Sequence, residues 1–431
     1  MLPTIELLDA ISDDVRTADA VIADFLRERR WLVGRERGQT LQRVDGVLRR
    51  RSQLDWWIAR AAHGLAPSGR LRVIAHLALV EGLPAVRIAK LFDGTRHMPK
   101  PLGGREESFL AAVEGKPLSD AAMPTSVRAN YPAWLETELR QVFGAKLELE
   151  MMAFAEPAPL DLRVNRLKVT RDAARAVLRA EGLKAEATAW SPLGLRLDRR
   201  IDLGRCNALS QGLVEPQDEG SQLAALLVDA RPGQFVVDFC AGAGGKTLAL
   251  AAAMQNRGRL VAADIAAGRL RRTRARLTRA GIDNVDIRNS VTERKWLKRQ
   301  AGRADRVLVD APCSGVGSWR RIPDARWRLR PEDVEELVVR QRSILADAAK
   351  LVAPGGRLVY VTCSVLPREN AQQVAAFLAT QADFAALPIS AVWSEVLECR
   401  CPTDDMYLEL TPARHGTGGF FVAVMARKFN S

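Results

Sequence analysis

The sequence predicts an α/β protein in three parts: a helical domain over residues 1–124, a small α+β subdomain over 125–212, and a mostly parallel, doubly wound sheet over 213–431. Two observations lead to this prediction. Apolar residues recur every three or four positions in the first part, as they do along one face of a helix. Short β-rich runs alternate with helical patterns in the last part, which is typical of parallel sheets.

In the first part, the helical spacing is clearest near the N-terminus. The apolar residues there follow one another at steps of three or four, or at sums of these steps: Ile5, Leu8, Ile11, Val15, Ile22 and Phe25. The same spacing returns over 41–48 and 70–83, and turn-forming stretches such as LAPSG and DGTRHMPKPLGG separate the segments. We therefore expect a small helical bundle.

The middle part mixes helix and strand. Residues 125–144 predict a helix that is broken near Pro132, and LDLRVN over 160–165 predicts a short strand. A second helix is expected to begin at Thr170 and to end at Gly182. In the last part, strands are expected at FVVDFC, GRLVAADI, NVDIRNS, DRVLVDAP, GRLVYVTCS and GFFVAVMARK.

Composition favours an anionic partner. The chain has 431 residues and a net charge of +13, which suits nucleic acid but could also serve solubility alone. The N-terminus lacks a secretory leader pattern, and no run of eighteen apolar residues occurs. The six cysteines are too scattered for a disulfide framework. We expect a soluble, cytoplasmic monomer with reduced thiols.

A glycine-rich turn follows the first strand of the sheet, in VVDFCAGAGGKT over 236–247. It is not a phosphate loop, because Cys240 stands where the first glycine would be, and Thr247 replaces the third glycine of a nicotinamide fingerprint. The next strand ends on Asp264, which could accept hydrogen bonds from both ribose hydroxyls. This pattern favours S-adenosylmethionine over a pyrophosphate cofactor, although a tight turn without a ligand remains an alternative.

Two cysteines, Cys313 and Cys363, each come directly after a predicted strand. If these two strands are neighbours, both thiols lie in the crevice beside the cofactor. Each could be a small buried apolar residue. The matched positions favour chemistry instead, because C5 of cytosine becomes nucleophilic once a thiolate adds to C6. A second thiol could then assist elimination.

These motifs resemble the Nop/Sun family of RNA cytosine-5 methyltransferases, also called Fmu or rRNA methyltransferase B-like proteins. The resemblance rests on DFCAGAGGKT, DAPCSGVGSWRRIPDARW and TCSVLPREN, together with EPQDEGSQ (215–222) and LRVNRLK (162–168). It covers residues 125–431 and implies a Rossmann-like class I methyltransferase fold with S-adenosylmethionine as cofactor.

The resemblance also implies roles for individual residues. Cys363 is the expected nucleophile and Cys313 is expected to assist product release, with Lys246 and Asp310 near the target base. Lys246 could instead be a solvated lysine. The cofactor is expected to contact Cys240, Ala241, Gly242, Ala243, Gly244, Gly245, Lys246, Asp264 and Asp310. Where the family carries an aspartate near the adenine, this chain has Asn289 and Ser290, and either oxygen could accept from the adenine amino group.

The remaining features concern RNA and metals. FLRERRW and VDGVLRRRSQLDWW make the first part similar to a NusB-like RNA-binding domain, and the middle part is expected to be RRM-like. Of two arginine-rich stretches, GRLRRTRARLTR is expected to be a solvated helix face and SWRRIPDARWRLR (318–330) an RNA contact. The four histidines and the pair of cysteines at 399 and 401 show no ligand spacing, so no metal is expected.

Three functions stay open. The preferred one is cytosine-5 methylation of RNA, most naturally 16S ribosomal RNA, with tRNA as an alternative substrate. Methylation of a base amino group would call for an aromatic residue at the position of Cys313. A non-catalytic RNA-binding ribosome-assembly factor is the third, although an intact glycine turn, Asp264 and both cysteines argue against it.

Overall fold

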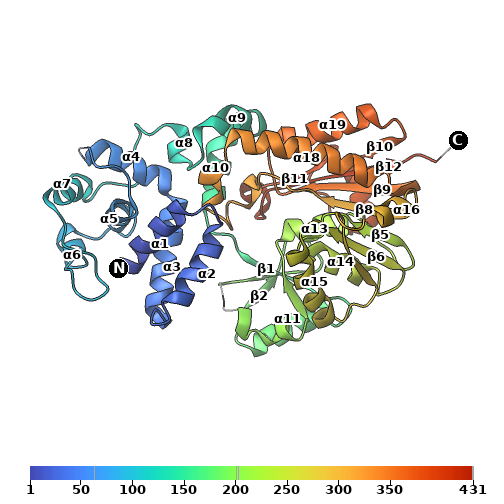
Figure 1. Ribbon diagram of the computed structural model, residues 1–431, viewed down its shortest axis with the longest axis horizontal. Coiled ribbons are helices and arrows are strands. Elements are labelled where there is room, and N and C mark those ends of the chain that lie inside the picture. The colour runs from blue at the N-terminus through green and yellow to red at the C-terminus, as the bar shows by residue number, and fades with distance from the viewer. Residues whose placement is uncertain (63, 200, 202, 430–431) are drawn as a thin grey trace. The chain divides into compact units, whose positions relative to one another are not determined.

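The computed structural model describes residues 1–62, 64–199, 201 and 203–429 (Figure 1). The chain forms two compact units. The first comprises Met1–Pro157 and Trp319–Leu329, and the second comprises Ala158–Ser318 and Arg330–Ser431. The first unit therefore extends past the predicted boundary at residue 124 and also takes in a segment from the C-terminal half of the chain.

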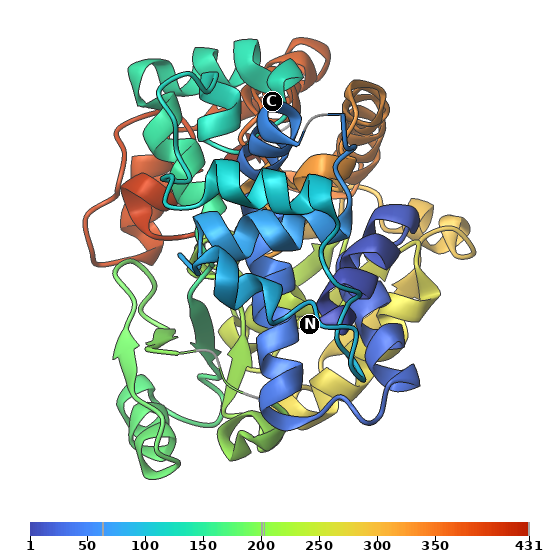
Figure 2. The ribbon, with the colours of Figure 1, turned by 90° about the vertical axis from the view of Figure 1, so that its left-hand side faces the viewer.

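The first unit is helical, as the apolar spacing predicts (residues 1–157 are blue to teal in Figures 1 and 2). Its elements are α1 (Leu2–Asp13), α2 (Ala18–Glu28), α3 (Gly34–Arg49), α4 (Arg51–Ala61), α5 (Gly69–Leu79), α6 (Ala85–Ala89), α7 (Gly104–Val113), α8 (Thr125–Arg128), η1 (Ala133–Leu135), α9 (Glu136–Phe143), η2 (Gly144–Lys146), α10 (Leu147–Ala155) and α17 (Ala325–Arg328). Ile5, Leu8, Ile11 and Phe25 are buried in its core, but Val15 is 96% exposed because α1 has already ended at Asp13.

The helices after residue 124 pack with the N-terminal ones through polar contacts. The Asn130 amide donates to Gln53 Oε1 over 2.7 Å, and the Ser52 hydroxyl lies 3.0 Å from Val127 O and donates to it. The helical break expected near Pro132 is present between α8 and η1. These contacts explain why the compact unit continues to Pro157.

The segment Trp319–Leu329 is part of the N-terminal unit, which corrects its prediction as an RNA contact. Trp319 and Arg326 are both fully buried. Arg326 donates from Nη1 to Asn130 O (2.7 Å) and from Nη2 to Phe154 O (2.9 Å). Residues this deeply buried do not offer their side chains to a nucleic acid, so Trp319 and Arg326 serve packing instead, whereas Arg321 is exposed and its contact with RNA stays a prediction.

The second unit begins with a four-stranded antiparallel sheet of order β2-β3-β1-β4, which Figure 2 shows in green. Its elements are β1 (Leu160–Val164), α11 (Arg171–Ala180), β2 (Ala185–Ala187), β3 (Gly194–Leu197), η3 (Leu203–Arg205), α12 (Asn207–Ser210) and β4 (Val214–Pro216). The expected helix start is confirmed, since the Thr170 hydroxyl accepts from Ala173 N and caps α11.

The large sheet has the order β10-β12-β9-β8-β5-β6-β7, with β11 paired to β12. Its elements are α13 (Glu219–Leu226), β5 (Phe235–Asp238), α14 (Gly245–Ala253), β6 (Arg259–Asp264), α15 (Ala267–Ala280), β7 (Val285–Asn289), α16 (Arg294–Arg299), β8 (Ala304–Asp310), η4 (Val316–Ser318), α18 (Pro331–Ala349), β9 (Val352–Thr362), η5 (Pro367–Glu369), α19 (Ala371–Thr380), β10 (Phe384–Leu387), α20 (Ile389–Val396), β11 (Leu408–Leu410), α21 (Pro412–His415) and β12 (Phe420–Arg427). Strands β5 to β9 pair in parallel, whereas β12 runs antiparallel to its neighbours.

Both faces of this sheet are covered, so the doubly wound prediction is confirmed (Figure 1). Alternate residues of one strand enter different cores: Val236 packs with α13 and α14, while Val237 packs on the side of α18 and α19. The strand order reverses between β5 and β8, and the carboxyl ends of strands at such a point form a ligand crevice. Among the described residues, no helix is long and apolar enough to span a membrane.

Candidate active site

The glycine-rich turn connects β5 to α14 at this reversal point. Gly242 and Gly244 have φ of 57° and 83°, a conformation that side chains disfavour. A Cβ on Gly244 would lie 2.5 Å from Thr273 Cγ2, so this glycine allows close packing against α15. A Cβ on Gly242 would meet no atom within 4 Å. The turn therefore packs tightly on one side and leaves space for a ligand on the other.

Asp264 ends the neighbouring strand β6 and binds this turn directly. Its Oδ2 accepts from Gly242 N at 2.8 Å, and its Oδ1 accepts from Ala266 N at 2.7 Å. A carboxylate has about four acceptor positions, so two remain for other donors. Asp264 thus lies where the sequence argument expects a ribose, and the residues around it fit S-adenosylmethionine.

Two arginines that the sequence analysis did not single out hold the carbonyl groups of the turn. Arg163, from β1, donates to Gly245 O at 2.7 Å, and Arg276, from α15, donates to Ala243 O. Arg276 is itself paired with Glu215, at 2.9 Å. Because two of its carbonyl groups are bound by arginines, the conformation of the turn is fixed without a ligand. Arg276 belongs to the arginine-rich face of α15 that was predicted to be solvated, but it stabilises the glycine turn.

Asn289 ends β7 and is paired in register with Asp264. Its Oδ1 accepts from Val291 N and Thr292 N, and its amide donates to Ile265 O. The side-chain oxygen is therefore already used by the local turn. Its contact with the adenine remains a prediction.

The two cysteines lie together. Strands β8 and β9 are parallel neighbours, with Asp310 opposite Val361, and this pairing brings Cys313 Sγ within 3.3 Å of Cys363 Sγ. The Gly317 amide donates to Cys363 O at 2.9 Å. The inference that both thiols share one crevice agrees with this geometry.

Lys246 and Asp310 form an ion pair next to the thiols. Lys246 Nζ lies 2.7 Å from Asp310 Oδ2, and Lys246 is only 8% exposed. Burial alone would lower the pKa of Lys246, but the adjacent Asp310 carboxylate raises it above its ordinary value. The ammonium group is therefore charged at neutral pH, and it is not a solvated lysine.

The three cysteines of this region differ in their proton affinity. The hydrogen bond from Cys313 lowers the pKa of the Cys363 thiol, although burial acts in the opposite direction. The same hydrogen bond, together with burial, raises the pKa of Cys313. Burial also raises the pKa of Cys240, so this residue of the turn stays a thiol. Cys363 is thus the member of the group best suited to act as a thiolate.

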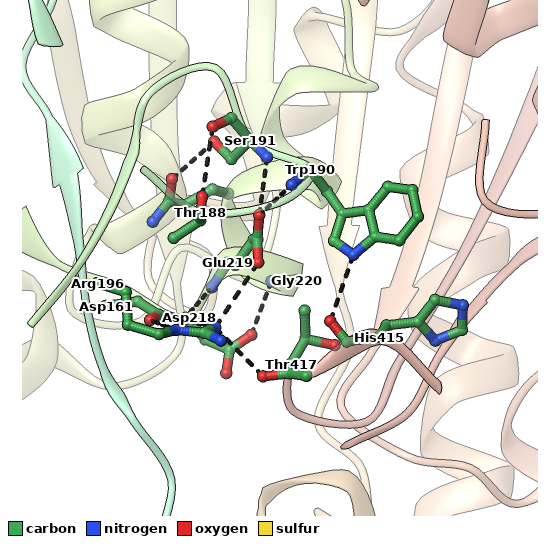
Figure 3. Close-up of polar contacts among 12 residues, drawn as sticks. Asp161, Thr188, Trp190, Ser191, Arg196, Asp218, Glu219, Gly220, His415 and Thr417 are labelled. Atoms are coloured by element: carbon green, nitrogen blue, oxygen red, sulfur yellow. Dashed lines mark hydrogen bonds and ion pairs between the residues drawn. The ribbon is translucent and has the colours of Figure 1, made fainter. Parts of the chain in front are cut away.

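A buried polar cluster joins the four-stranded sheet to the large sheet (Figure 3). Arg196 donates to both oxygens of Asp161, at 2.7 and 3.0 Å, and Asp161 also accepts from Glu219 N. The Glu219 carboxylate accepts from the backbone amides of Trp190 and Ser191. Asp218 of the EPQDEGSQ stretch also accepts from Gly418 N at 3.0 Å, just before β12, so this stretch connects the two sheets.

A glycine turn at the reversal point of a doubly wound sheet, with an acid at the end of the next strand, is typical of Rossmann-like nucleotide-binding folds, and here it belongs to a class I methyltransferase that uses S-adenosylmethionine. Family models agree. The model described as 16S rRNA methyltransferase RsmB/F matches residues 225–426, and the ferredoxin-like domain of RsmF/B-like methyltransferases matches 131–204.

Relatives match along most of the chain. The ribosomal RNA small subunit methyltransferase B of Sodalis glossinidius is 32% identical over 400 residues, which cover 89% of this chain and 88% of the relative. The protein of the same name from Escherichia coli is 32% identical over 403 residues, 89% of each chain. A crystal structure of a methyltransferase homolog protein from Pyrococcus horikoshii is 27% identical, with a TM-score of 0.60 over 72% of this chain and 99% of its own. The chain belongs to the RsmB/F methyltransferase family, which is the Nop/Sun family that its motifs resemble.

We expect Asp264→Ala to weaken S-adenosylmethionine binding at least tenfold. A hydrogen bond to a charged acceptor contributes about 1.5–3 kcal/mol, and the substitution also releases the amide of Gly242. Titration calorimetry measures the affinity. The control is Asp283→Ala, which replaces an exposed acid just before β7, and it should leave the affinity for S-adenosylmethionine unchanged. Equal affinities for both variants would contradict the assignment of Asp264.

Proposed function

We propose that this protein methylates C5 of a cytidine in 16S ribosomal RNA through a covalent adduct between Cys363 and C6 of the base. The observation that carries the proposal is the pair of thiols 3.3 Å apart, beside a buried lysine–aspartate ion pair. An amino-group methyltransferase has no need of two adjacent thiols, whereas C5 chemistry needs one to attack and profits from a second to release.

The reaction then follows from the groups that surround the base. The Cys363 thiolate adds to C6, and the electron pair of the C5–C6 double bond becomes available at C5. Bound S-adenosylmethionine supplies the methyl group. Cys313 first releases its own proton to solvent and, as a thiolate, removes the proton from C5; the double bond then reforms and Cys363 leaves as a thiolate.

The ion pair acts on the nucleophile in both directions. The positive charge of Lys246 favours the thiolate of Cys363, whereas the negative charge of Asp310, which holds the ammonium group over 2.7 Å, opposes it. Asp310 ends β8, and Lys246 lies in the first turn of α14, the helix that follows β5. We assign them to positioning the target base, together with the cofactor contacts expected at the glycine turn and Asp264.

The choice of ribosomal RNA is supported by the names of the relatives from Sodalis and Escherichia coli, which are small-subunit methyltransferases. A net charge of +13 suits the same substrate, in the cytoplasm. Bisulfite mapping of ribosomal RNA and tRNA from a strain lacking the gene tests the proposal. Loss of one 5-methylcytosine in 16S RNA is expected. Loss confined to tRNA would identify the alternative substrate, and no loss in either would contradict cytosine-5 methylation.

The rate of RNA methylation at low RNA concentration should fall steeply as salt is raised. Binding through several Lys and Arg residues releases counterions, and about six phosphate contacts would weaken affinity roughly 10³-fold between 50 and 200 mM salt. Methylation assays over this range measure the slope. Binding of S-adenosylmethionine alone is the control and should change little. A flat slope for RNA would argue against an electrostatic interface.

A further inference from the structure

A buried carboxylate lies between the two cysteine loops and belongs to no role assigned above. Glu369, at the end of η5 after strand β9, is fully buried. Its oxygens accept hydrogen bonds from the Ser314 amide at 2.8 Å, from Gln341 Nε2 at 2.9 Å and from the hydroxyls of Ser314 and Ser364. All four donors are uncharged. Burying a carboxylate costs free energy, which hydrogen bonds from neutral donors offset less well than a cationic partner would.

Donors to this carboxylate come from the residues next to both thiols. A serine follows each cysteine directly: Ser314 follows Cys313, and Ser364 follows Cys363. Both serine hydroxyls donate to the same oxygen, Oε2 of Glu369. A single carboxylate therefore ties together the residues next to both sulfurs. Any movement of one loop away from the other would break one of these bonds.

Helix α18 supports the same carboxylate. Gln341 Nε2 donates to Glu369 Oε1 and also to Pro312 O, the residue before Cys313, at 2.9 Å each. The phenol of Tyr360 donates to the backbone oxygen of Glu369 at 2.7 Å. The glutamate is thus held on both its side chain and its backbone, which is the arrangement expected of a group that must not move.

Glu369 is bound more closely to the Cys313 loop than to the Cys363 loop. The Cys313 loop donates to it from both the amide and the hydroxyl of Ser314, whereas the Cys363 loop donates from the Ser364 hydroxyl alone. Besides the hydrogen bond to Cys363 and burial, the negative charge of Glu369 contributes to raising the pKa of Cys313. The carboxylate thereby favours the state in which the proton lies on Cys313 and Cys363 is the thiolate.

We propose that Glu369 is a positioning residue that fixes the distance between the two thiols and keeps the shared proton on Cys313, so that Cys363 is the thiolate. This inference rests on the proposed cytosine-5 reaction and deepens it. The family resemblance assigns the two cysteines their roles without a physical reason, because their strand positions are equivalent. Glu369 contributes to the difference between the two thiols, because its contacts and its charge lie on the side of Cys313.

The test measures thiol reactivity without RNA or cofactor. Iodoacetamide alkylates thiolates, and peptide mass spectrometry gives the alkylation rate of Cys363 divided by that of Cys313. Glu369→Gln retains the length of the side chain but removes its charge. We expect this ratio to fall about tenfold, the change in thiolate population that corresponds to one pKa unit. Glu369→Asp retains the charge and should keep the ratio within about twofold of the wild-type value.

A purely structural role predicts a different pattern. Glu219→Gln is the matched control, because Glu219 is also fully buried and also accepts from backbone amides, yet contacts neither cysteine loop. It should lower the melting temperature and leave the ratio unchanged. If Glu369→Gln lowers the melting temperature in the same way without changing the ratio, the proposal is wrong. If the Glu369→Gln variant does not fold, the Glu369→Asp variant decides: equal alkylation rates of Cys363 and Cys313 in that variant would also overturn the proposal. Neither result depends on whether the wild-type protein methylates cytosine.

Discussion

Cys363→Ala should abolish methylation and should form no covalent protein–RNA species. The substitution removes the sulfur whose lowered pKa makes it the better nucleophile of the pair, and without addition to C6 the C5 carbon does not attack a methyl group. We expect a loss of at least about 10³-fold in rate, as when a covalent nucleophile is removed from other enzymes. Incorporation of labelled methyl groups into RNA measures this loss.

Cys313→Ala should behave differently, because it leaves the nucleophile in place. Attack and methyl transfer should still occur, whereas elimination should be slow. The stalled adduct contains a carbon–sulfur bond that detergent does not break, so a shifted band should appear on a denaturing gel. Cys399→Ala, an exposed cysteine, is the control and should retain normal turnover. An adduct in Cys363→Ala and none in Cys313→Ala would exchange the two roles.

Arg326→Ala should destabilise the N-terminal unit by about 3 kcal/mol. The two carbonyl groups that lose their donor each cost about 1–3 kcal/mol, and the deleted side chain leaves a cavity. Release of the buried charge offsets part of this loss, since burial lowers the pKa of Arg326 to about 9. Denaturant unfolding with hydrogen exchange of the N-terminal helices measures the change.

Two companion variants make this test specific. Arg105→Ala, on the exposed surface of α7, should change the free energy of unfolding by less than about 0.5 kcal/mol. Arg326→Met fills most of the cavity and should recover part of the loss. If Arg326→Ala were as stable as Arg105→Ala, the segment around Arg326 would not be part of this unit's core.

Much of the catalytic fold could be predicted from the sequence because its signals are local. Each central strand is a short apolar run next to a helical pattern, and the neighbouring positions of Cys313 and Cys363 follow from parallel pairing alone. The edge strand β10 was not predicted, since Phe384–Leu387 is too short and too rich in alanine to stand out. Its place depends on pairing with β12.

The segment after Cys313 could not be predicted, for a different reason. Arginine next to tryptophan usually indicates a surface for nucleic acid, and nothing local distinguishes a buried arginine from an exposed one. The carbonyl groups that accept from Arg326 belong to Asn130 and Phe154, which lie 196 and 172 residues away from it in the sequence. Likewise, Glu369 stands inside a motif quoted for its cysteine, and only the folded structure shows that its carboxylate reaches both loops.

The inserted segment also affects how the chain can fold as it is made. The N-terminal unit holds Trp319 and Arg326 in its interior, so its core cannot be completed when residue 157 leaves the ribosome. About 160 further residues, at roughly 5–20 residues per second, must be synthesised first, which leaves a partly built helical unit waiting for some ten to thirty seconds. During this interval the nascent helices expose apolar surface that a chaperone could bind. The N-terminal unit can therefore be completed only after residue 329 has been made, when most of the second unit has already been synthesised.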